Sequence, residues 1–346
     1  GDVYKRQTLS SDALAQVWPV VALLAKGVQT GAGRAHVFLT LRLVTTMGVR
    51  LAPTRVFEDA RARRDVQDTF VRLGEQVLSL YARSLDVTSV ARDSDSASVA
   101  SEREDIANDA AAPTPVQVVQ FFAASALPAL QSLAIETDRA MSLCTSLAYY
   151  VLAPGFKSRA RAMDIEPLVL DLLTQMSTLT GTSKTWRAVV WDTFLDAKFF
   201  ALSPAMGKRW APIVAALMSA ERDRLVDVIG RMAPAPSTNL FTSREADVIA
   251  RVVGVRRLAY TVWTAQPHTF LAQLPLIQEK VVDILRAQSA ELVQAEVYLC
   301  MRVLLCRFSS QHLAGFWPIL LTELMRIFGK ARTELPEPRT AVSYTH

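Results

Sequence analysis

The fold is decided by one stretch near the carboxyl end, Glu291–Phe308, which reads ELVQAEVYLCMRVLLCRF. A helix turns about 100° per residue, so apolar residues in this stretch gather on defined faces. One arc contains Val293, Val297, Cys300, Met301, Leu304 and Phe308. A second stripe contains Leu292, Leu299 and Val303, and charged residues separate the two: Glu291, Glu296, Arg302 and Arg307. A surface helix has one apolar stripe, so two stripes predict a helix covered on both sides within stacked helical layers.

The next stretch, 310–329, also has a clear apolar face. Phe316, Leu320, Leu324 and Ile327 share this face, and Glu323 and Arg326 lie opposite. Trp317-Pro318 should bend the helix so that its apolar face packs on 291–308. The core predicted for this region consists of Val297, Cys300, Leu304, Phe308, Trp317, Leu320 and Leu324.

Helical spacing dominates the rest of the chain, and two β signals are missing: sustained alternation and Asn-Gly or Asp-Gly turns. Helices are predicted over 11–28, 35–50, 54–84, 115–151 (with a break near Pro128), 158–179, 184–201, 205–219, 221–232, 243–265, 275–288, 291–308 and 310–329. Proline after an aromatic residue or leucine recurs at irregular intervals: Trp18-Pro19, Leu127-Pro128, Leu274-Pro275 and Trp317-Pro318. We therefore predict an all-α fold, an irregular HEAT-like helical-repeat array (α-solenoid) with no sheet.

The domain organisation is predicted from shifts in composition. An N-terminal helical segment over 8–85 is followed by an acidic, serine-rich stretch over 86–114 without an aromatic residue, which predicts a disordered loop. This loop could be a phosphorylation tract or a plain spacer. A helical array over 115–330 and a tail over 331–346 complete the chain. The ends, 1–7 (GDVYKRQ) and 341–346 (AVSYTH), resemble translated adapter sequence, so we expect them to lie outside the fold and the chain to be a fragment.

Composition limits the class of protein. The chain has 346 residues, of which 51% are hydrophobic, so it can bury a large core and is not globally disordered. The net charge of +5 permits an acidic partner but is weak for a nucleic-acid binder, which requires a continuous basic stripe. Three cysteines are too few for a disulfide framework and indicate reduced core thiols in a cytosolic protein. The uncharged stretch 116–135 contains three glutamines and Pro128, which favours a buried helix over a membrane span.

No catalytic or metal-binding constellation is found in the sequence. The histidines do not form an HExxH motif, and Cys300 lies on the densest apolar arc, where a thiol is unreactive. Gly181-Thr182-Ser183-Lys184-Thr185 lacks the glycine that precedes the lysine of a phosphate-binding loop, so it is interpreted as a helix–helix turn. Ser309 is expected to cap the last helix, with His312 in its first turn. We predict that the protein is not an enzyme and that it binds no cofactor.

Basic residues beside aromatic ones form three clusters: Trp186-Arg187, Lys208-Arg209-Trp210 and Arg256-Arg257 near Tyr260. Such clusters can contact anionic lipid headgroups or an acidic partner. The candidate contact residues are therefore Arg187, Lys208, Arg209, Arg256 and Arg257. The alternative is structural: an arginine lays its aliphatic stem along the aromatic residues and keeps its charged end in water.

Within 183–328 the chain resembles the C-terminal region of the Dopey family. The matching segments are KTWRAVVWDTFLDAKFF (184–200), PSTNLFTSRE (236–245), LPLIQEKVVDIL (274–285) and QAEVYLCMRVLLCRFSSQHLAGFWPILLTELMRIF (294–328). The last segment is the most specific, because Ser310-Gln311-His312-Leu313 and Trp317-Pro318 follow in the family's order.

The resemblance implies a large, cytosolic, peripheral membrane protein of endosome–Golgi traffic, located at the trans-Golgi network and endosomes. It implies two partners: a large scaffold resembling Arf exchange factors, and an aminophospholipid flippase. It implies no catalytic residues. The leading hypothesis is a non-catalytic scaffold segment. The alternatives are an anionic-lipid-binding helical module and a helical-repeat protein with another binding role.

Overall fold

The computed structural model describes residues 11–28, 33–82, 84–85, 112–157, 165–232, 244–287 and 290–334. In these ranges all regular structure is helical and there is no strand, which confirms the predicted all-α helical-repeat class. The chain forms two compact units, Gly1–Ala220 and Glu221–His346. The predicted disordered loop at 86–114 lies almost wholly outside the described residues, as do both ends that resemble adapter sequence.

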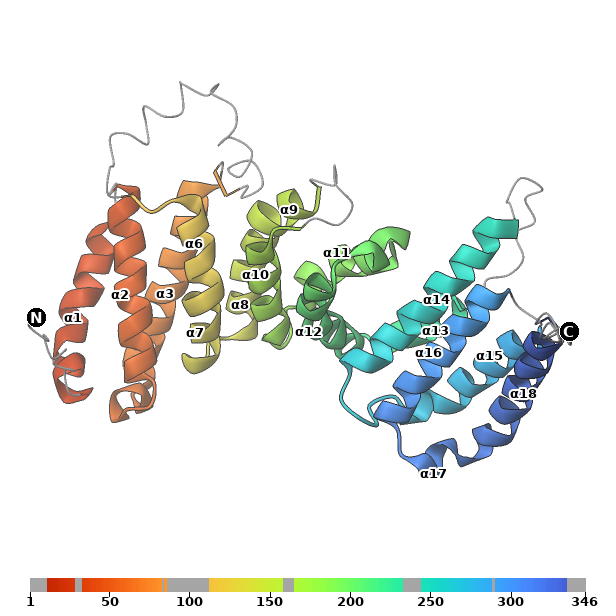
Figure 1. The fold of residues 1–346 in the computed structure, drawn as a ribbon. Coiled ribbons are helices and arrows are strands. Elements are labelled where there is room, and N and C mark those ends of the chain that lie inside the picture. The colour runs from red at the N-terminus through yellow and green to blue at the C-terminus, as the bar shows by residue number, and fades with distance from the viewer. Residues whose placement is uncertain are drawn as a thin grey trace, which may run out of the picture. The chain divides into compact units, whose positions relative to one another are not determined.

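The first unit is a stack of helices, with α1, α2 and α3 side by side and α6–α7 next to them (Figure 1). Its elements are α1 (Ser11–Val28), α2 (Arg34–Leu51), η1 (Arg55–Glu58), α3 (Ala60–Tyr81), α6 (Pro115–Phe121), η2 (Phe122–Ala126), α7 (Leu127–Ser132), α8 (Thr137–Leu147), η3 (Ala148–Leu152), α9 (Ala153–Lys157), α10 (Pro167–Thr178), α11 (Ser183–Leu195), η4 (Ala197–Ala201) and α12 (Pro204–Ala220).

The segment 115–151 is broken, as predicted, but the break is not near Pro128: the helix continues through Pro128, and the chain turns between Leu133 and Glu136. Ala134 adopts a positive φ of 48° in this turn. The amide of Gln67 on α3 donates to the carbonyl oxygens of Leu133 at 2.8 Å and Ala134 at 3.1 Å. A buried amide thus satisfies carbonyls that the broken helix leaves unpaired, which fixes the turn against α3.

Two wide turns interrupt the helices of this region, and each has the same cause. The π-helical turns η2 and η3 are each followed, two residues later, by a proline: Pro128 and Pro154. Proline has no N–H and its ring collides with the carbonyl four residues earlier, which belongs here to Ala124 and Tyr150. Widening the turn around those two residues moves the carbonyls aside and lets the helix continue.

Helix α3, which precedes the 86–111 segment, contacts helix α8, which follows it. Asp68 forms an ion pair with Arg139, and the Ser142 hydroxyl donates to Glu75 at 2.7 Å. Residues on the two sides of that segment therefore share one core. The boundary between compact units lies instead at 220/221, inside the array predicted as continuous over 115–330.

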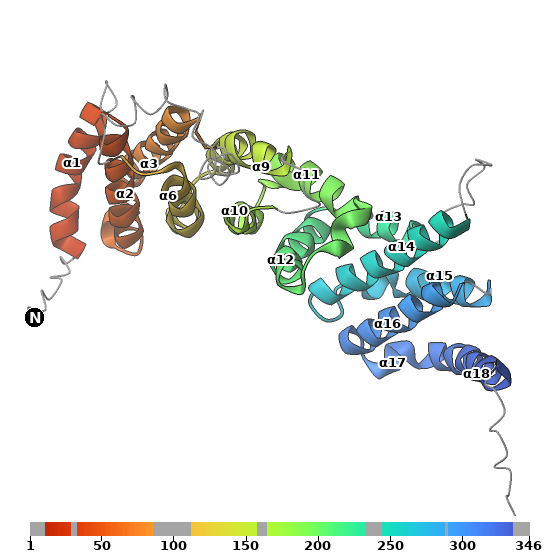
Figure 2. The same cartoon turned by 45° about the horizontal axis from the view of Figure 1, so that its top comes forward.

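The second unit consists of α13 (Asp223–Gly230), α14 (Arg244–Thr264), η5 (Leu271–Gln273), α15 (Leu274–Arg286), α16 (Glu291–Arg307), α17 (Ser310–Leu313), η6 (Ala314–Phe316) and α18 (Trp317–Glu334). Helices α14 and α16 lie side by side along their length in both views (Figures 1 and 2). Gly254 lets α14 approach the end of α13: a Cβ there would collide with the Arg231 carbonyl oxygen and lie 3.0 Å from Met232 Cα.

The prediction that α16 is covered on both sides is wrong within the described residues. Its first arc is buried, with Val297, Cys300 and Leu304 fully enclosed. The second stripe is open: Leu299 is 46% exposed and Leu292 66%, and Val303 is half-buried. The reason is that α14 makes the main contact with α16 and α15 a smaller one, whereas α18 contacts α15 and reaches α16 through the Lys330–Glu291 ion pair.

The predicted packing of the last helix on 291–308 also differs from the structure. Phe308 and Leu320 are buried, but Leu324 is only half-buried and Trp317 is exposed, so Trp317 is not a core residue. The buried side of α18 carries Leu320, and Trp317 lies beside it with 38% of its surface exposed. Over the described ranges, no helix combines the length and hydropathy that a membrane-spanning helix requires.

Candidate functional site

The buried cysteines Cys300 and Cys144 are not suited to act as catalytic nucleophiles. Cys300 is fully buried, and burial raises the pKa of its thiol to about 12; the same cause raises the pKa of Cys144 to about 12. A thiol held protonated in an apolar core is a poor nucleophile. Within the described ranges, no group of three histidine, cysteine or carboxylate side chains could hold a metal ion.

His312 and Ser309 bind each other at the start of α17. The Ser309 Oγ lies 2.6 Å from the His312 Nδ1, and the Ser309 side chain makes no bond to a backbone amide of the helix. The expected side-chain cap is therefore absent here, although Ser309 does occupy the N-cap position. The imidazole ring is exposed and stacks edge-on against His268 with ring centroids 5.7 Å apart.

The glycine-containing stretch that resembles a phosphate-binding loop is a helix–helix turn, as predicted. It joins α10 to α11, and Gly181 takes a φ of 80°, which a residue with a side chain rarely adopts. The Thr182 hydroxyl is buried and donates to the Met176 carbonyl at 3.0 Å and to the Leu179 carbonyl at 2.9 Å. Its side chain thus completes the end of α10 instead of facing a ligand.

In the first unit, the basic candidates are partly used to join helices. Arg209 on α12 forms an ion pair with Asp171 on α10. Arg187 is half-buried on α11, and Lys208 is exposed. The neighbouring Trp186 and Trp210 are buried, and Trp210 stacks edge-on against Phe199 at 5.4 Å between centroids. The aromatic members of these clusters are therefore core residues.

In the second unit, Arg256 on α14 forms an ion pair with Glu296 on α16. The hydrogen bond to Glu296 raises the pKa of the Arg256 guanidinium. Arg257 is only 5% exposed, so its prediction as a surface contact is wrong. It lies on the face of α14 that carries the buried Leu258 and Thr261. The five basic candidates are divided between the two units, and three of them serve helix packing.

A different surface lies open on α18. Four large apolar side chains follow one face of this helix: Trp317, Leu321, Met325 and Phe328. We name this set the α18 stripe. Its members are between 38% and 71% exposed. Glu323 and Arg326, joined by a 2.8 Å ion pair, lie on the opposite side of the same helix. A contiguous exposed apolar row of this kind is typical of a surface that binds another protein.

Sequence reasoning missed the α18 stripe for a specific reason. The sequence predicts one apolar face from Phe316, Leu320, Leu324 and Ile327, and three of the four stripe residues lie outside that prediction. Spacing of four, four and three residues places Trp317, Leu321, Met325 and Phe328 on one face as well. The signal that would have revealed the stripe is a second apolar row on the same helix, because neighbouring helices cannot cover both rows.

The fold and the surface define a class of protein: a helical-repeat segment with an open apolar helix face, in which the described residues assemble no metal site. The chain belongs to the DOP1 C-terminal family, whose sequence model matches residues 6–345. The resemblance to the Dopey family is thereby confirmed.

Several curated relatives are similar over most or part of the chain. The DOP1 homolog of Drosophila melanogaster is 28% identical over 299 residues, which cover 83% of this chain and 11% of the relative. DOP1B of Mus musculus is 25% identical over 362 residues, 96% of this chain and 15% of the relative. Pad-1 of Caenorhabditis elegans is 30% identical over 167 residues, which cover 48% of this chain and 7% of the relative. The chain thus spans a small part of these relatives. No solved structure matches it.

Proposed function

We propose that this chain is a non-catalytic scaffold segment of a peripheral membrane protein that acts in traffic between endosomes and the trans-Golgi network. Membership of the DOP1 family supports the trafficking role. The observation that carries the scaffold role is the α18 stripe, because a folded helix that leaves Leu321, Met325 and Phe328 in water gains stability when a partner covers them.

The stripe suits binding of a partner helix or groove. Its four side chains are spaced so that each could enter a gap between residues of an opposing apolar surface. Its aromatic members supply large contact areas, which usually dominate the energy of an interface.

The partners we propose are a large scaffold resembling Arf exchange factors and an aminophospholipid flippase, at the cytoplasmic face of trans-Golgi and endosomal membranes. The anionic-lipid alternative gains no support from the basic candidates, because Arg209 and Arg256 are engaged in ion pairs and Arg257 is buried.

The test is quantitative co-purification from cells followed by mass spectrometry. The wild-type chain is compared with the double variant Leu321→Asp/Met325→Asp, which places two charges on the stripe. Val226→Asp is the matched control, because Val226 is an exposed apolar residue of the same unit outside the stripe. Circular dichroism should show the same helical content for all three proteins.

The expected result is loss of the trafficking partners with the double variant and their retention with Val226→Asp. Equal recovery with the double variant and the wild type would show that the stripe does not dock them. Recovery of an enzyme activity with the purified chain would contradict the scaffold role itself.

A further inference from the structure

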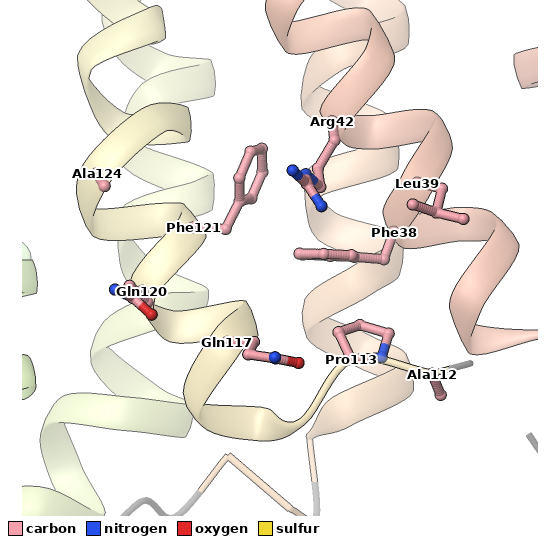
Figure 3. A pocket seen from close by; sticks show the side chains of 9 residues that line it. All are labelled: Phe38, Leu39, Arg42, Ala112, Pro113, Gln117, Gln120, Phe121 and Ala124. Atoms are coloured by element: carbon pink, nitrogen blue, oxygen red, sulfur yellow. The ribbon is translucent and has the colours of Figure 1, made fainter. Parts of the chain in front are cut away.

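A groove in the first unit has a composition suited to a ligand. It lies between α2 and α6 and has a volume of about 460 Å³, within the usual size range of binding pockets. Phe38 and Arg42 enter it from α2, Gln117 and Phe121 from α6, and Pro113 closes one end (Figure 3). No sequence pattern joins these residues, because α2 and α6 are far apart in the chain.

The walls of the groove are held in place by contacts of their own. Phe38 and Phe121 meet edge-on, with ring centroids 5.3 Å apart and an interplanar angle of 76°. The Arg42 guanidinium lies over the Phe38 ring, 5.9 Å from its centroid. The Tyr81 hydroxyl on α3 donates to the Pro113 carbonyl at 3.0 Å. The groove is therefore formed before any ligand arrives, which reduces the entropy that binding must offset.

The groove presents hydrogen-bond donors and one positive charge. Arg42 is the single charged side chain among the described residues that line it. The Gln117 Oε1 accepts the Thr114 N–H at 2.9 Å, so the amide group of Gln117 offers its NH₂ as a donor. Gln120, one turn further along α6, is exposed at the rim. Helix α2 contains three arginines and no acidic residue, which adds to the positive potential.

We propose that this groove binds an extended segment of a partner polypeptide in which an acidic residue stands beside an apolar one. The Arg42 guanidinium pairs with the carboxylate, with two parallel N–H···O bonds available. The apolar side chain packs on the half-buried Phe121 ring, which the buried Phe38 ring supports edge-on. The primary amides of Gln117 and Gln120 bond the peptide backbone. A phosphate group would use the single guanidinium but leave the aromatic floor unoccupied, so the carboxylate-bearing peptide is the better match.

The experiment is affinity selection of a random decapeptide display library on the folded full chain. The three comparison proteins are Arg42→Glu, Ala124→Trp and Arg50→Glu. Ala124 is an exposed residue of the groove wall, and tryptophan there fills the groove without changing its charge. Arg50→Glu is the matched control, since it makes the same charge change on α2 outside the groove. The selected peptide is then synthesised, and its binding is measured by fluorescence anisotropy.

Selected peptides should share an acidic residue next to an aromatic or aliphatic one. Their Kd should rise about tenfold or more with Arg42→Glu and with Ala124→Trp, and stay about unchanged with Arg50→Glu. Failure to enrich such a motif, or equal binding by Arg42→Glu, would overturn the proposal. Competition by millimolar inorganic phosphate, or by phosphatidylserine vesicles whose binding needs Arg42, would overturn it in favour of an anion or a lipid surface. The groove is independent of the α18 stripe, so Leu321→Asp/Met325→Asp should leave peptide binding intact.

Discussion

Replacing Gly254 by alanine should destabilise the second unit, although alanine is the better helix former. Gly254 lies within α14, where its missing side chain admits the end of α13. A Cβ at this position would collide with the Arg231 carbonyl oxygen and lie 3.0 Å from both the Arg231 carbonyl carbon and Met232 Cα. All of these atoms belong to backbone, so no side chain can rotate away to relieve the contact.

The magnitude follows from two opposing effects. Ordinary carbon–carbon contacts are about 3.5–4.0 Å, so the chain at Met232 must move by roughly 0.5–1 Å. Overpacking of this kind destabilises by about 1–3 kcal/mol, and a backbone neighbour favours the upper end. The higher helix propensity of alanine offsets about 1 kcal/mol of this loss in stability. The net loss of about 2 kcal/mol should lower the Tm of the unit by roughly 8 °C.

The assay is differential scanning calorimetry of the full chain, combined with amide hydrogen exchange of peptides from α13 and α14. Gly329→Ala on α18 is the matched control, because no atom lies within 4 Å of its Cβ position. That substitution should raise the Tm by about 2–4 °C through propensity alone. An unchanged or higher Tm for Gly254→Ala, or an equal fall for both variants, would refute the account of the α13–α14 contact.

Other predictions test burial on α16. Leu304→Asp should unfold the second unit in circular dichroism melts, by several kcal/mol, because it places an unpaired charge in the core, whereas Leu299→Asp should change stability by about 0.5 kcal/mol or less. Iodoacetamide at pH 8 should label Cys306 at once and Cys300 only after unfolding, and rapid labelling of both would contradict the enclosed position of Cys300. The raised pKa of Cys300 also means that stability is lost as pH rises above about 9, where the unfolded thiol ionises first. Tyr298→Phe should leave the urea midpoint unchanged or raise it, because the Tyr298 hydroxyl is buried without a hydrogen-bond partner in the described ranges; a clear drop would reveal one.

Much of the fold could be predicted because helical periodicity is local information. The capping box at Thr114, with N–H bonds to and from Gln117, confirms the helix start predicted at Pro115. The sequence predicts a break near Pro128, but its actual position after Leu133 could not be predicted, since it depends on the Gln67 amide from another helix. Periodicity shows which faces of α16 are apolar, but whether Leu299 meets a neighbour is decided by tertiary packing.

The candidate site was harder to predict than the fold. Clusters of arginine and tryptophan in sequence indicate charge at a surface, but Arg257 lies inward and Arg256 meets an acid forty residues away. Such pairings are set by the packing of α14 on α16. The groove between α2 and α6 likewise depends on residues that only folding brings together. Local sequence identifies the chemical groups, and long-range packing decides which of them remain available.

The contacts between α3 and α8 also predict how the protein behaves after its backbone is cut between these helices. Gln67, Asp68 and Glu75 bond to partners beyond the 86–111 segment, and the buried faces of both helices meet there. A single proteolytic nick within 86–111 should therefore leave two pieces that elute together under native conditions and separate only in denaturant. The same property would permit new chain ends at that point, so a circularly permuted or split version should still assemble.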